Sequence, residues 1–562
     1  MSVTDFPASR PSAVDLDALI VGAGPTGLAL AAQLRAFGAR FRIIDRLTDR
    51  ARESRALAVQ ARSLELLQML GLGEALVARG RTSTTLALHL DGRRVAEVPL
   101  GEIGATDTRF PFILFVSQAE TEALLGEHLG AAGVTVERGV ALTVVESSAD
   151  HVRCVLRHAD GREEHLRVSY LAGCDGAHST VRAAMGVRFE GGAYPETFVL
   201  GDVEADGPLL PDAINSFVGR GVAMFFPLGR PATWRVIAMA ADDVGGAAAR
   251  DAGNTSDDLS LAELQTIVDA PTGGAIRVHD PVWLTRFRLH HRQTAHYREG
   301  RTFLVGDAAH IHSPVGAQGM NTGIQDAWNL GWKLALVTRG SADPRLLDSY
   351  EAERWPVGRF LLRYTDRAFG TLTRVTSSGA LAGWARRIVV PSVLPRVMGS
   401  RRLRASAFRF VSELGIRYRR SPAVREGEPR LHGGPRAGDR LPDVRLTRGG
   451  RPVWLQEAVS SPRLALLLCG DAEGWDVGRL AGIQARYPEL LSVHHVTRHA
   501  APAVQGALVD ERGEALARLG VHDAAQYLVR PDGHVGFRCA ARALPELERY
   551  LVEWYPPLVP GP

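Results

Sequence analysis

Lysine is almost absent from this sequence. Of its 66 basic residues only Lys333 is a lysine, and all the others are Arg. Because 62 acidic residues oppose them, the formal net charge of +4 is small for a chain of 562 residues. There is no basic tract and no zinc-finger or RNP spacing. Nucleic acid is therefore not an expected partner, and the Arg bias points to a GC-rich genome.

Cysteine is scarce too. The four cysteines, Cys154, Cys174, Cys469 and Cys539, include no CxxC pair and are too few for a disulfide scaffold. This usage fits a reducing compartment, so we expect a cytoplasmic protein. Dithiol redox chemistry and a bound metal ion are not expected.

Long apolar runs are missing as well. No run reaches the roughly 20 residues that a membrane-spanning helix needs, and the N-terminal stretch MSVTDFPASRPSAVD has no signal-peptide pattern. The content of 45% apolar and 23% charged residues is that of an ordinary globular protein. The length predicts two to four domains.

The first chemically informative run is VGAGPTGLALAAQLRAFGARFRIIDR, residues 21–46. A short buried strand, 17–21, precedes a glycine-rich turn, an Ala/Leu-rich helix and a second strand, 41–44, that ends in an acid. The glycines and the acid are Gly22, Gly24, Gly27 and Asp45. Such glycines allow a tight turn and a close approach to a pyrophosphate, and the acid suits a ribose hydroxyl. An adenine dinucleotide is favoured over a tight turn in an unrelated α/β domain.

Two further runs also pass from a strand through a glycine-containing turn towards a helix. GCDGAHSTVR, residues 173–182, follows the predicted strand 169–172, although an ordinary turn with a Ser cap explains it equally well. GDAAHIHSPVGAQGMN, residues 306–321, follows a predicted strand and precedes a helix predicted over 321–334. This last connection places backbone N–H groups and a positive helix end beside a crevice.

The rest of the chain divides into three parts. Residues 191–282 carry short apolar strands between turn residues, which predicts an antiparallel sheet inserted into the nucleotide-binding domain. Residues 355–420 are helical and Arg-rich, and packing on the enzyme body is favoured there over association with a membrane surface. After a Gly/Pro-rich boundary at 433–439, strands at 463–470 and around a Pro-Asp-Gly turn in 526–538 predict a smaller α/β unit.

Taken in order, VGAGPTGLALAAQL, CDGAHSTVR and VGDAAHIHSPVGAQGMNTGIQDAWNLGWKL resemble the single-component (class A) FAD-dependent aromatic hydroxylases of the p-hydroxybenzoate and phenol hydroxylase superfamily. The likeness covers nearly the whole chain and is greatest to polyketide hydroxylases with a thioredoxin-like C-terminal domain. It implies a mixed α/β and α+β fold. The implied parts are a Rossmann-like FAD-binding domain (14–190 and 283–365), an inserted antiparallel-sheet substrate domain (191–282, with parts of 80–115), a helical linker (366–432) and a thioredoxin-like domain (433–558).

The resemblance also assigns residues to the cofactor. The implied cofactor-binding set is Gly22, Gly24, Gly27, Asp45, Arg46, Arg55, Gln118, Asp175, Gly306, Asp307, Pro314, Gly319, Met320 and Asn321. Within this set Asp45 would bind ribose, Arg46 and Arg55 the pyrophosphate region, and Asp307 the ribityl chain. Asp175 belongs to a motif near FAD that is also tied to NAD(P)H.

Around the flavin ring the resemblance implies a catalytic environment built from the third run. Pro314 would bend the backbone over the isoalloxazine. The N–H groups of residues 319–321, at the start of a helix, would face flavin N1 and C2=O, where the reduced ring is negative. His310 and His312 are candidate acids or bases, but a structural role is at least as well supported because neither has a second matched partner.

The resemblance implies a reaction as well. With one dinucleotide fingerprint rather than two, NADPH or NADH would bind transiently, reduce non-covalently bound FAD and leave. Reaction with O2 would give a flavin C4a-hydroperoxide that hydroxylates an electron-rich carbon of a small aromatic substrate. The implied function is an NAD(P)H- and O2-dependent monooxygenase of polyketide tailoring. The C-terminal unit, which lacks a CxxC, would be a redox-inert appendage, with packing, solubility or subunit contact as its open roles.

Several alternatives stay open at this point. Baeyer–Villiger oxygenation of a polyketide uses the same fold. A flavin halogenase is disfavoured, because no W-x-W-x-I-P run occurs and the chain has a single Lys. From another class, a non-catalytic flavin-binding protein is the alternative. The oligomeric state is also open, with a homodimer among the options.

One departure from the family bears on the substrate. Phenol-type members place an acid in an A-D-G-L-Q run, where it can deprotonate the phenol. Here the run is ALAVQ, residues 56–60, and Leu57 takes the acidic position. A simple phenol has a pKa of about 10 and forms little phenolate without a base. We therefore expect a polycyclic phenol or quinone with a more acidic hydroxyl; activation by Arg235 or Tyr297 is the alternative.

Overall fold

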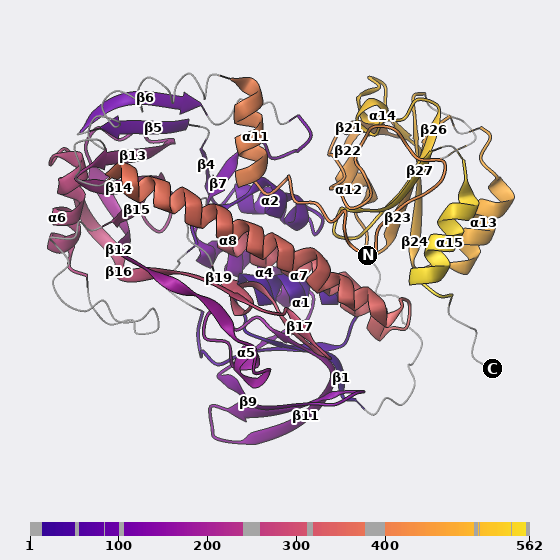
Figure 1. The fold of residues 1–562 in the computed structure, drawn as a ribbon, viewed down its shortest axis with the longest axis horizontal. Helices are drawn as coiled ribbons and strands as arrows, with labels where there is room; N and C mark the ends of the chain where they lie inside the picture. Colours follow the sequence, from indigo (N-terminus) through magenta and orange to yellow (C-terminus); the bar gives the residue numbers. More distant parts are fainter. Residues whose placement is uncertain are drawn as a thin grey trace.

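The computed structural model describes residues 14–50, 56–83, 85–90, 92–99, 106–239, 259–311, 318–376, 400–471, 473–499, 504, 506–540 and 542–557. Figure 1 shows a sheet with helix α6 (Leu261–Thr272) at the left, a central α/β unit, and the C-terminal unit in yellow at the right. The long helix α8 (Asp348–Thr376) runs across this view. Among the described residues, no helix combines the length and the apolar character needed to cross a membrane.

The central sheet is built around the first predicted strand. Its parallel strands, in spatial order, are β8 (Val136–Arg138), β2 (Phe41–Asp45), β1 (Leu16–Val21), β11 (Glu163–Gly173) and β18 (Thr302–Leu304). Its antiparallel additions are β17 (Arg298–Glu299), β10 (Val152–His158) and β9 (Val140–Ser147). Ala18, Leu19 and Ile20 are completely buried, as expected for a strand covered on both faces. Such doubly wound sheets bind ligands beyond the carboxyl ends of their strands.

Helices α1 (Pro25–Ala36) and α7 (Gly319–Thr338) pack against each other in the central unit. Two glycines of α7 make the contact close. A Cβ on Gly323 would overlap the Thr26 side chain, and one on Gly331 would lie 2.6 Å from Gln33 Cβ. Thr26 and Gly323 are the second and fifth residues of their helices. The packing therefore brings the two helix starts together.

The second sheet is mostly antiparallel. Its strands, in spatial order, are β19 (His310–Ile311), β16 (Arg277–Thr294), β12 (Phe189–Asp206), β15 (Trp234–Met239), β14 (Gly221–Pro227), β13 (Ala213–Gly219), β5 (Thr85–Leu90) and β6 (Arg93–Pro99). Most of these strands come from the region where an inserted sheet was expected, and β5 and β6 join it from an earlier part of the chain. We call it the substrate sheet.

The two faces of the substrate sheet differ. Successive residues of a strand point to opposite faces. Phe225 and Val236 pack in one core with helix α6, which begins at a capping box formed by Ser260 and Glu263. Met224 and Phe226 lie on the other face, in an apolar cluster with residues of the central unit.

The C-terminal unit is a third mixed sheet with helices. Its strands, in spatial order, are β20 (Arg425–Glu426), β27 (Val535–Ala540), β26 (Ala524–Val529), β23 (Leu464–Gly470), β24 (Leu491–Thr497), β25 (Leu508–Val509), β21 (Arg445–Arg448) and β22 (Arg451–Trp454). Helix α13 (Val477–Arg486) connects β23 to its parallel neighbour β24, and α15 (Leu544–Trp554) follows β27. The Pro-Asp-Gly turn joins antiparallel β26 and β27, as predicted.

The remaining elements are a small sheet and several helices. They are the sheet β3 (Ala58–Val59), β7 (Ile113–Phe115) and β4 (Arg81–Ser83), and the helices α2 (Ala61–Gln68), α3 (Gly73–Val77), α4 (Gln118–Ala131), α5 (Thr180–Ala184), η1 (Gly306–Ala308), η2 (Pro344–Leu347), α11 (Arg401–Val411), α12 (Leu455–Val459) and α14 (Glu514–Arg518). Residues 377–399 of the expected helical linker lie outside the described residues. The mixed α/β fold class expected from the resemblance is confirmed, and the domain bounds stay a prediction.

Candidate active site

The three glycine-containing runs meet at the carboxyl ends of β1, β11 and β18. Val305 N–H donates to Gly173 O at 3.0 Å, which joins the third run to the second. Arg182, in helix α5, donates from Nη1 to Ala308 O at 3.0 Å. Segments far apart in the sequence therefore form one site, at the edge where doubly wound sheets bind their ligands.

The glycines of the first run have different roles. Gly22 has a φ of +103°, and a Cβ there would overlap Cys174 O, while a Cβ on Gly27 would overlap Gly22 O. Around Gly24, by contrast, no atom lies within 4 Å of the position a Cβ would take. Gly24 directly precedes helix α1. Gly22 and Gly27 are thus needed for packing, whereas Gly24 leaves space at a positive helix end, which suits a pyrophosphate.

Asp45 lies at the end of β2, beside this glycine turn. Its Oδ2 accepts from Ala23 N–H at 2.8 Å and its Oδ1 accepts from Leu47 N–H at 2.9 Å. Each carboxylate oxygen has a second lone pair, so the fixed carboxylate can also accept ribose hydroxyls. Arg46 follows it in the chain and is exposed.

Asp307 occupies the one-turn helix η1, directly after β18. Its side chain is exposed although its neighbours Gly306 and Ala308 are buried. Gly306 has a φ of +63°, and a Cβ there would lie 2.7 Å from Thr26 Oγ1. This close approach places the Asp307 turn beside the start of α1. An exposed carboxylate there fits the role of an acceptor for ribityl hydroxyls.

Helix α7 begins at Gly319, close to where the sequence predicts its start. The Asn321 side chain is buried against strand β3: Oδ1 accepts from Gln60 N–H at 2.8 Å, and Nδ2 donates to Ala58 O at 2.9 Å. That amide holds the helix start in place, so the predicted contact with the flavin falls to the backbone N–H groups of residues 319–321. The predicted site residues that lie outside the described residues are Arg55, His312 and Pro314.

Gln118 and Asp175 both hold local structure. Gln118 is the first residue of α4, and its Nε2 donates to Glu122 Oε1 at 2.8 Å. Asp175 Oδ2 accepts from Thr180 N–H at 2.7 Å, and its Oδ1 accepts from Ser179 Oγ at 2.5 Å, at the start of α5. Burial raises the pKa of Asp175. Contact of either residue with FAD stays a prediction.

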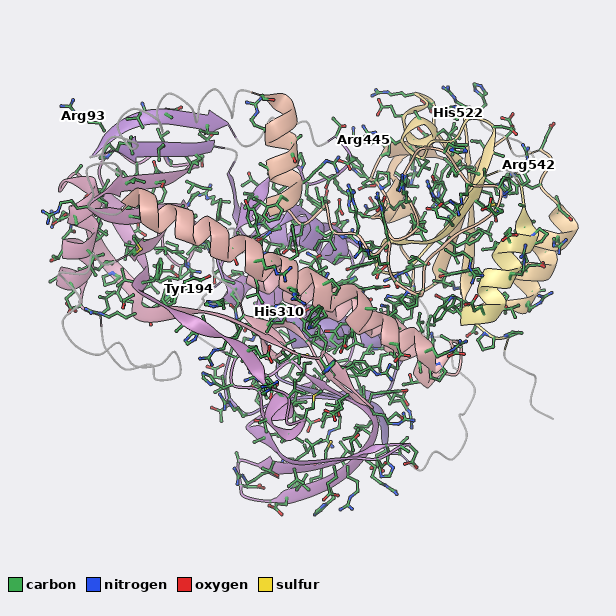
Figure 2. The ribbon with its side chains drawn as sticks, viewed as in Figure 1. Arg93, Tyr194, His310, Arg445, His522 and Arg542 are labelled. Carbon is green, nitrogen blue, oxygen red and sulfur yellow. The ribbon has the colours of Figure 1, made fainter. Side chains whose placement is uncertain are left out.

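His310 has a partner that the sequence did not reveal. Its Nε2 lies 2.7 Å from Asp326 Oδ2, and both side chains are fully buried. The imidazole also stacks on Tyr297, with 5.7 Å between ring centroids. Figure 2 shows His310 in the interior of the molecule. These contacts support the structural role for His310. Burial raises the pKa of Tyr297 well above its ordinary value, so the phenol stays protonated and is no base.

Leu57 faces the substrate sheet. Leu57 belongs to an apolar cluster formed by the central unit and the substrate sheet together. The cluster includes Leu57, Phe115, Ile214, Met224, Phe226, Leu228 and Ile237. Arg235 stands at its edge, with Nε 2.6 Å from Asp202 Oδ1 and Nη2 2.7 Å from Asp202 Oδ2. Its Nη1 donates to Ala56 O at 2.7 Å. Arg235 thus holds the segment before Leu57 against the sheet, and its predicted contact with substrate stays a prediction.

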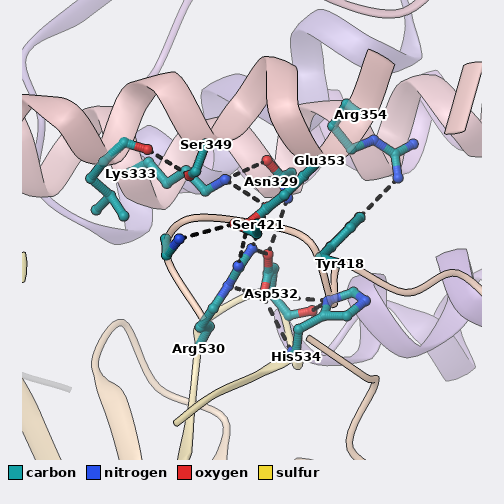
Figure 3. A network of polar contacts seen from close by, with 12 residues as sticks. Asn329, Lys333, Ser349, Glu353, Arg354, Tyr418, Ser421, Arg530, Asp532 and His534 are labelled. Carbon is teal, nitrogen blue, oxygen red and sulfur yellow. Dashed lines mark hydrogen bonds and ion pairs between the residues drawn. The ribbon is translucent and has the colours of Figure 1, made fainter. Parts of the chain in front are cut away.

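The C-terminal unit is not the appendage that the sequence predicted. Arg530 donates from Nη1 and Nη2 to the two carboxylate oxygens of Glu353 in α8, at 2.6 and 2.8 Å. Lys333 Nζ lies 2.8 Å from the same carboxylate, and all three side chains are buried (Figure 3). A second buried pair joins Arg440 to Glu65 of α2, at 2.6 Å. The prediction of an appendage is therefore wrong, because the unit completes the ion pairing of the central domain.

The cysteines of the C-terminal unit have the character of buried apolar side chains. Cys469 on β23 and Cys539 on β27 are free and buried, and strand β26 lies between their strands. Burial raises the pKa of both thiols, that of Cys539 to about 11. Reactive thiolate is scarce at neutral pH under these conditions. This supports the prediction of a redox-inert unit.

Two buried charged residues that follow the third glycine-containing run, residues 306–321, were not predicted from the sequence. Asp326 and Lys333 both belong to helix α7 and are fully buried there. A buried charge is stable only when it is paired, so a charge within an apolar helix predicts a distant partner. The chain's one lysine was such a signal, but its partner is not identifiable from local sequence.

The residues at the site fit FAD. The fixed Asp45 carboxylate follows β2, the space at Gly24 follows β1 and the exposed Asp307 follows β18. The spatial order of these strands is the order in which a dinucleotide would present its ribose, pyrophosphate and ribityl groups. When bound, FAD would supply the redox and oxygen chemistry, and these residues would hold its pyrophosphate, ribose and ribityl groups.

Comparison with known proteins supports the same reading. Residues 15–365 match the family of FAD binding domains, and residues 434–557 match the aromatic-ring hydroxylase C-terminal domain. A relative named 6-methylpretetramide 4-monooxygenase, from Streptomyces rimosus, is 36% identical over 539 residues, which are 93% of this chain and 91% of the relative. The OxyS anhydrotetracycline hydroxylase structure from Streptomyces rimosus superposes with a TM-score of 0.74 at 31% identity, over 96% of this chain and 99% of that chain. CabE, an aromatic hydroxylase from angucycline biosynthesis, also gives 0.74 at 31% identity, over 97% and 99%. The chain therefore belongs to the FAD-dependent aromatic-ring hydroxylases and is an FAD-dependent monooxygenase.

Proposed function

We propose that this monooxygenase hydroxylates a fused polycyclic phenol or quinone of polyketide type. NADPH or NADH would be the transient reductant and O2 the source of the oxygen atom. The observation that carries the proposal is the apolar face of the substrate sheet opposite Leu57. The names of the relatives support it, because they refer to a pretetramide, an anhydrotetracycline and angucycline biosynthesis.

Three apolar side chains of this face are only partly covered by the rest of the protein. Met224, Phe226 and Ile237 on adjacent strands β14 and β15 are only half-buried, whereas the residues alternating with them are buried against α6. Burial of apolar surface contributes roughly 25 cal/mol per Å2. A flat fused ring system would cover all three side chains and would exclude water from the reacting carbon.

Leu57 removes the base that a simple phenol needs. A buried leucine, 4% exposed, stands where phenol-type relatives would carry an acid. A simple phenol, with a pKa of about 10, stays protonated at neutral pH. A hydroxyl conjugated to a quinone carbonyl spreads its charge over the ring system and ionises without a protein base. In this proposal the residues of the chain orient the ring and keep it dry, while the substrate supplies its own activation.

The test is coupled turnover, measured as hydroxylated product formed per NADPH consumed. We expect coupling with anthraquinone- or angucyclinone-type compounds and uncoupled NADPH oxidation with single-ring phenols. Coupling with single-ring phenols and none with polycycles would reject the proposal. An ester or lactone product would assign Baeyer–Villiger chemistry instead.

A variant pair makes this test specific to the apolar face. Phe226→Ala should reduce coupling with the polycyclic compound, because it removes a half-buried ring from the proposed pocket. Phe360→Ala on α8 is the matched control, since that phenylalanine is 56% exposed and lies outside the cluster. Equal coupling in both variants would show that the face does not hold the substrate. The oligomeric state, for which a homodimer is one option, and the expected cytoplasmic location are separate from this test.

A further inference from the structure

A single carboxylate closes the turn that carries Asp307. Asp326 Oδ2 accepts from Gly306 N–H at 3.2 Å and lies 2.7 Å from His310 Nε2. Gly306 and His310 stand at the two ends of this turn. Movement of Asp326 would therefore change the position of Asp307, which fits the ribityl chain of the cofactor.

Arg354 of helix α8 holds this carboxylate from the other side. Its Nε donates to Asp326 Oδ1 at 2.5 Å, and its Nη2 donates to Thr322 O at 3.1 Å. Thr322 lies in the first turn of α7, whose start would face the flavin ring. One buried guanidinium thus joins the ribityl turn to the helix start. Burial acts to raise the pKa of Asp326, but Arg354 and His310 outweigh it, so the pKa is lowered and the carboxylate stays charged.

Tyr418 binds the third nitrogen of the Arg354 guanidinium. Arg354 Nη1 donates to Tyr418 Oη at 2.9 Å (Figure 3). Tyr418 follows helix α11, and its backbone is tied to the C-terminal unit, because its N–H donates to Gly438 O at 2.7 Å. Its ring lies against His534, with 4.3 Å between centroids. The C-terminal unit therefore fixes both the backbone and the ring of Tyr418.

His534 is in turn fixed by buried charges. Its N–H donates to Asp532 Oδ1 at 3.2 Å, and Asp532 pairs with Arg530. Arg530 reaches back to Glu353, which precedes Arg354 in α8. The contacts thus run from the C-terminal unit to α8 along two routes that end at adjacent residues. Figure 3 shows this arrangement around Glu353.

We propose that Tyr418 is a positioning residue for the flavin, through which the C-terminal unit sets the Asp307 turn and the start of α7 by way of Arg354 and Asp326. Tyr418 does not touch the reacting atoms in this proposal. It removes the freedom of Arg354 to turn away from the carboxylate. The consequence is that the C-terminal unit contributes to cofactor affinity although the Rossmann-like sheet carries the cofactor fingerprint.

The test is FAD release from the full-length holoenzyme. Tyr418→Phe removes one hydrogen bond to a charged group and keeps the ring against His534. We expect FAD to bind about tenfold more weakly, because Arg354 loses a hydrogen bond and is then freer to turn away from Asp326. The measurement is flavin fluorescence on dilution of the holoenzyme, together with the visible flavin spectrum, which should shift. Neither reading depends on the identity of the substrate.

Tyr550→Phe is the matched control. Tyr550 is also a buried tyrosine, and its hydroxyl donates to Ala423 O at 2.9 Å, away from Asp326. It should lower the melting temperature as much as Tyr418→Phe while leaving FAD release and the flavin spectrum unchanged. Unchanged FAD release in Tyr418→Phe would overturn the proposal. Equal weakening in both variants would overturn it too, since the effect would then be one of general stability.

A double-mutant cycle separates positioning from local packing. If Tyr418 acts through Asp326, then Tyr418→Phe in an Asp326→Asn background should cause no further loss of FAD affinity. Additive losses would contradict the proposed route. Should Asp326→Asn fail to fold, the flavin midpoint potentials of the two Tyr→Phe variants decide. A shift in Tyr418→Phe alone supports the proposal, and no shift in either overturns it.

Discussion

Arg530 and Glu353 form a buried ion pair across the boundary between the C-terminal unit and helix α8, with two hydrogen bonds of 2.6 and 2.8 Å. The two residues are 177 positions apart in the chain. Lys333 also forms an ion pair with Glu353, so this one carboxylate is paired with two cations. Burial acts to raise the pKa of Glu353, but Arg530 and Lys333 outweigh it and hold the pKa well below its usual range. The C-terminal unit is therefore part of the folded core rather than an independent attachment.

This pair predicts the cost of removing Arg530. Arg530→Met should destabilise the protein by about 3–5 kcal/mol, because it removes the guanidinium partner of buried Asp532 and leaves buried Glu353 with one cation instead of two. Arg430→Met is the control, since that arginine is 71% exposed and pairs only at the surface. Denaturant unfolding of both variants checks the difference. A loss in Arg530→Met no larger than that in Arg430→Met would show that the pair contributes nothing.

Alanine substitutions at two glycines of the first run should have different effects, one on folding stability and the other on FAD binding. Gly27→Ala should destabilise the fold by about 1–3 kcal/mol or more, because the new methyl overlaps Gly22 O. Gly24→Ala should leave the melting temperature of the apoprotein unchanged, since its φ of −75° suits alanine and the methyl meets no atom. It should still lose FAD, because the methyl enters the space for the pyrophosphate. Retained FAD in Gly24→Ala would show that the pyrophosphate binds elsewhere.

Asp307 predicts loss of cofactor without loss of fold. Asp307→Ala removes an exposed carboxylate, and the apoprotein should still fold and melt in one cooperative transition. FAD affinity should fall by about ten- to a hundredfold, the usual worth of hydrogen bonds to a charged group. Absorbance of the purified protein in the flavin bands measures occupancy. Asp150→Ala, at a carboxylate that is 76% exposed, should purify fully yellow; equal occupancy in both variants would reject the role of Asp307.

Glu413 predicts a pH dependence of stability. It is buried, with a φ of +59°, and Thr322 Oγ1 donates to its Oε1 at 2.8 Å. Burial raises its pKa from 4.5 to about 8, although Thr322, Arg354 and Gln325 act in the opposite direction and Asp326 adds to the rise. Between pH 4.5 and about 8, the Glu413 carboxyl is therefore protonated in the folded protein and ionised in the unfolded chain.

The stabilising effect of this proton is complete below pH 4.5 and is lost as the pH rises to about 8. In that interval the free energy of unfolding should fall by roughly 1.4 kcal/mol per pH unit. Glu413→Gln has no proton to lose, so its stability relative to the native protein should increase as the pH rises. Unfolding of both proteins at several pH values measures the difference. A difference that is independent of pH would place the carboxyl in its ionised form.

The cofactor half of the site was predictable because its geometry is local. Gly22, Gly24, Gly27 and Asp45 stand at fixed offsets along one strand–helix–strand unit, and backbone sterics require glycine at two of them. The Asp307 turn follows its strand in the same way. Leu57 was predictable as a member of an apolar site, because it replaces an acid in an otherwise recognisable run.

The rest depends on contacts between distant parts of the chain. The residues around Glu353 in the sequence do not indicate that Arg530 is its partner. Those around His310 do not indicate that Asp326 binds both the His310 imidazole and Gly306 N–H. Arg235 was identified as a candidate for the substrate, but its guanidinium holds Asp202 and the Ala56 carbonyl. Such pairings follow from the packing of whole domains, which single-sequence patterns do not specify.

The most direct measurement is the mass of the product formed under isotopically labelled dioxygen. The holoenzyme would be given NADPH and an angucyclinone- or anthraquinone-type phenol. We expect a product heavier by one labelled oxygen atom, carried as a ring hydroxyl, with NADPH consumed in equal amount. Oxidation of NADPH with no labelled product from any polycyclic or single-ring aromatic would contradict it.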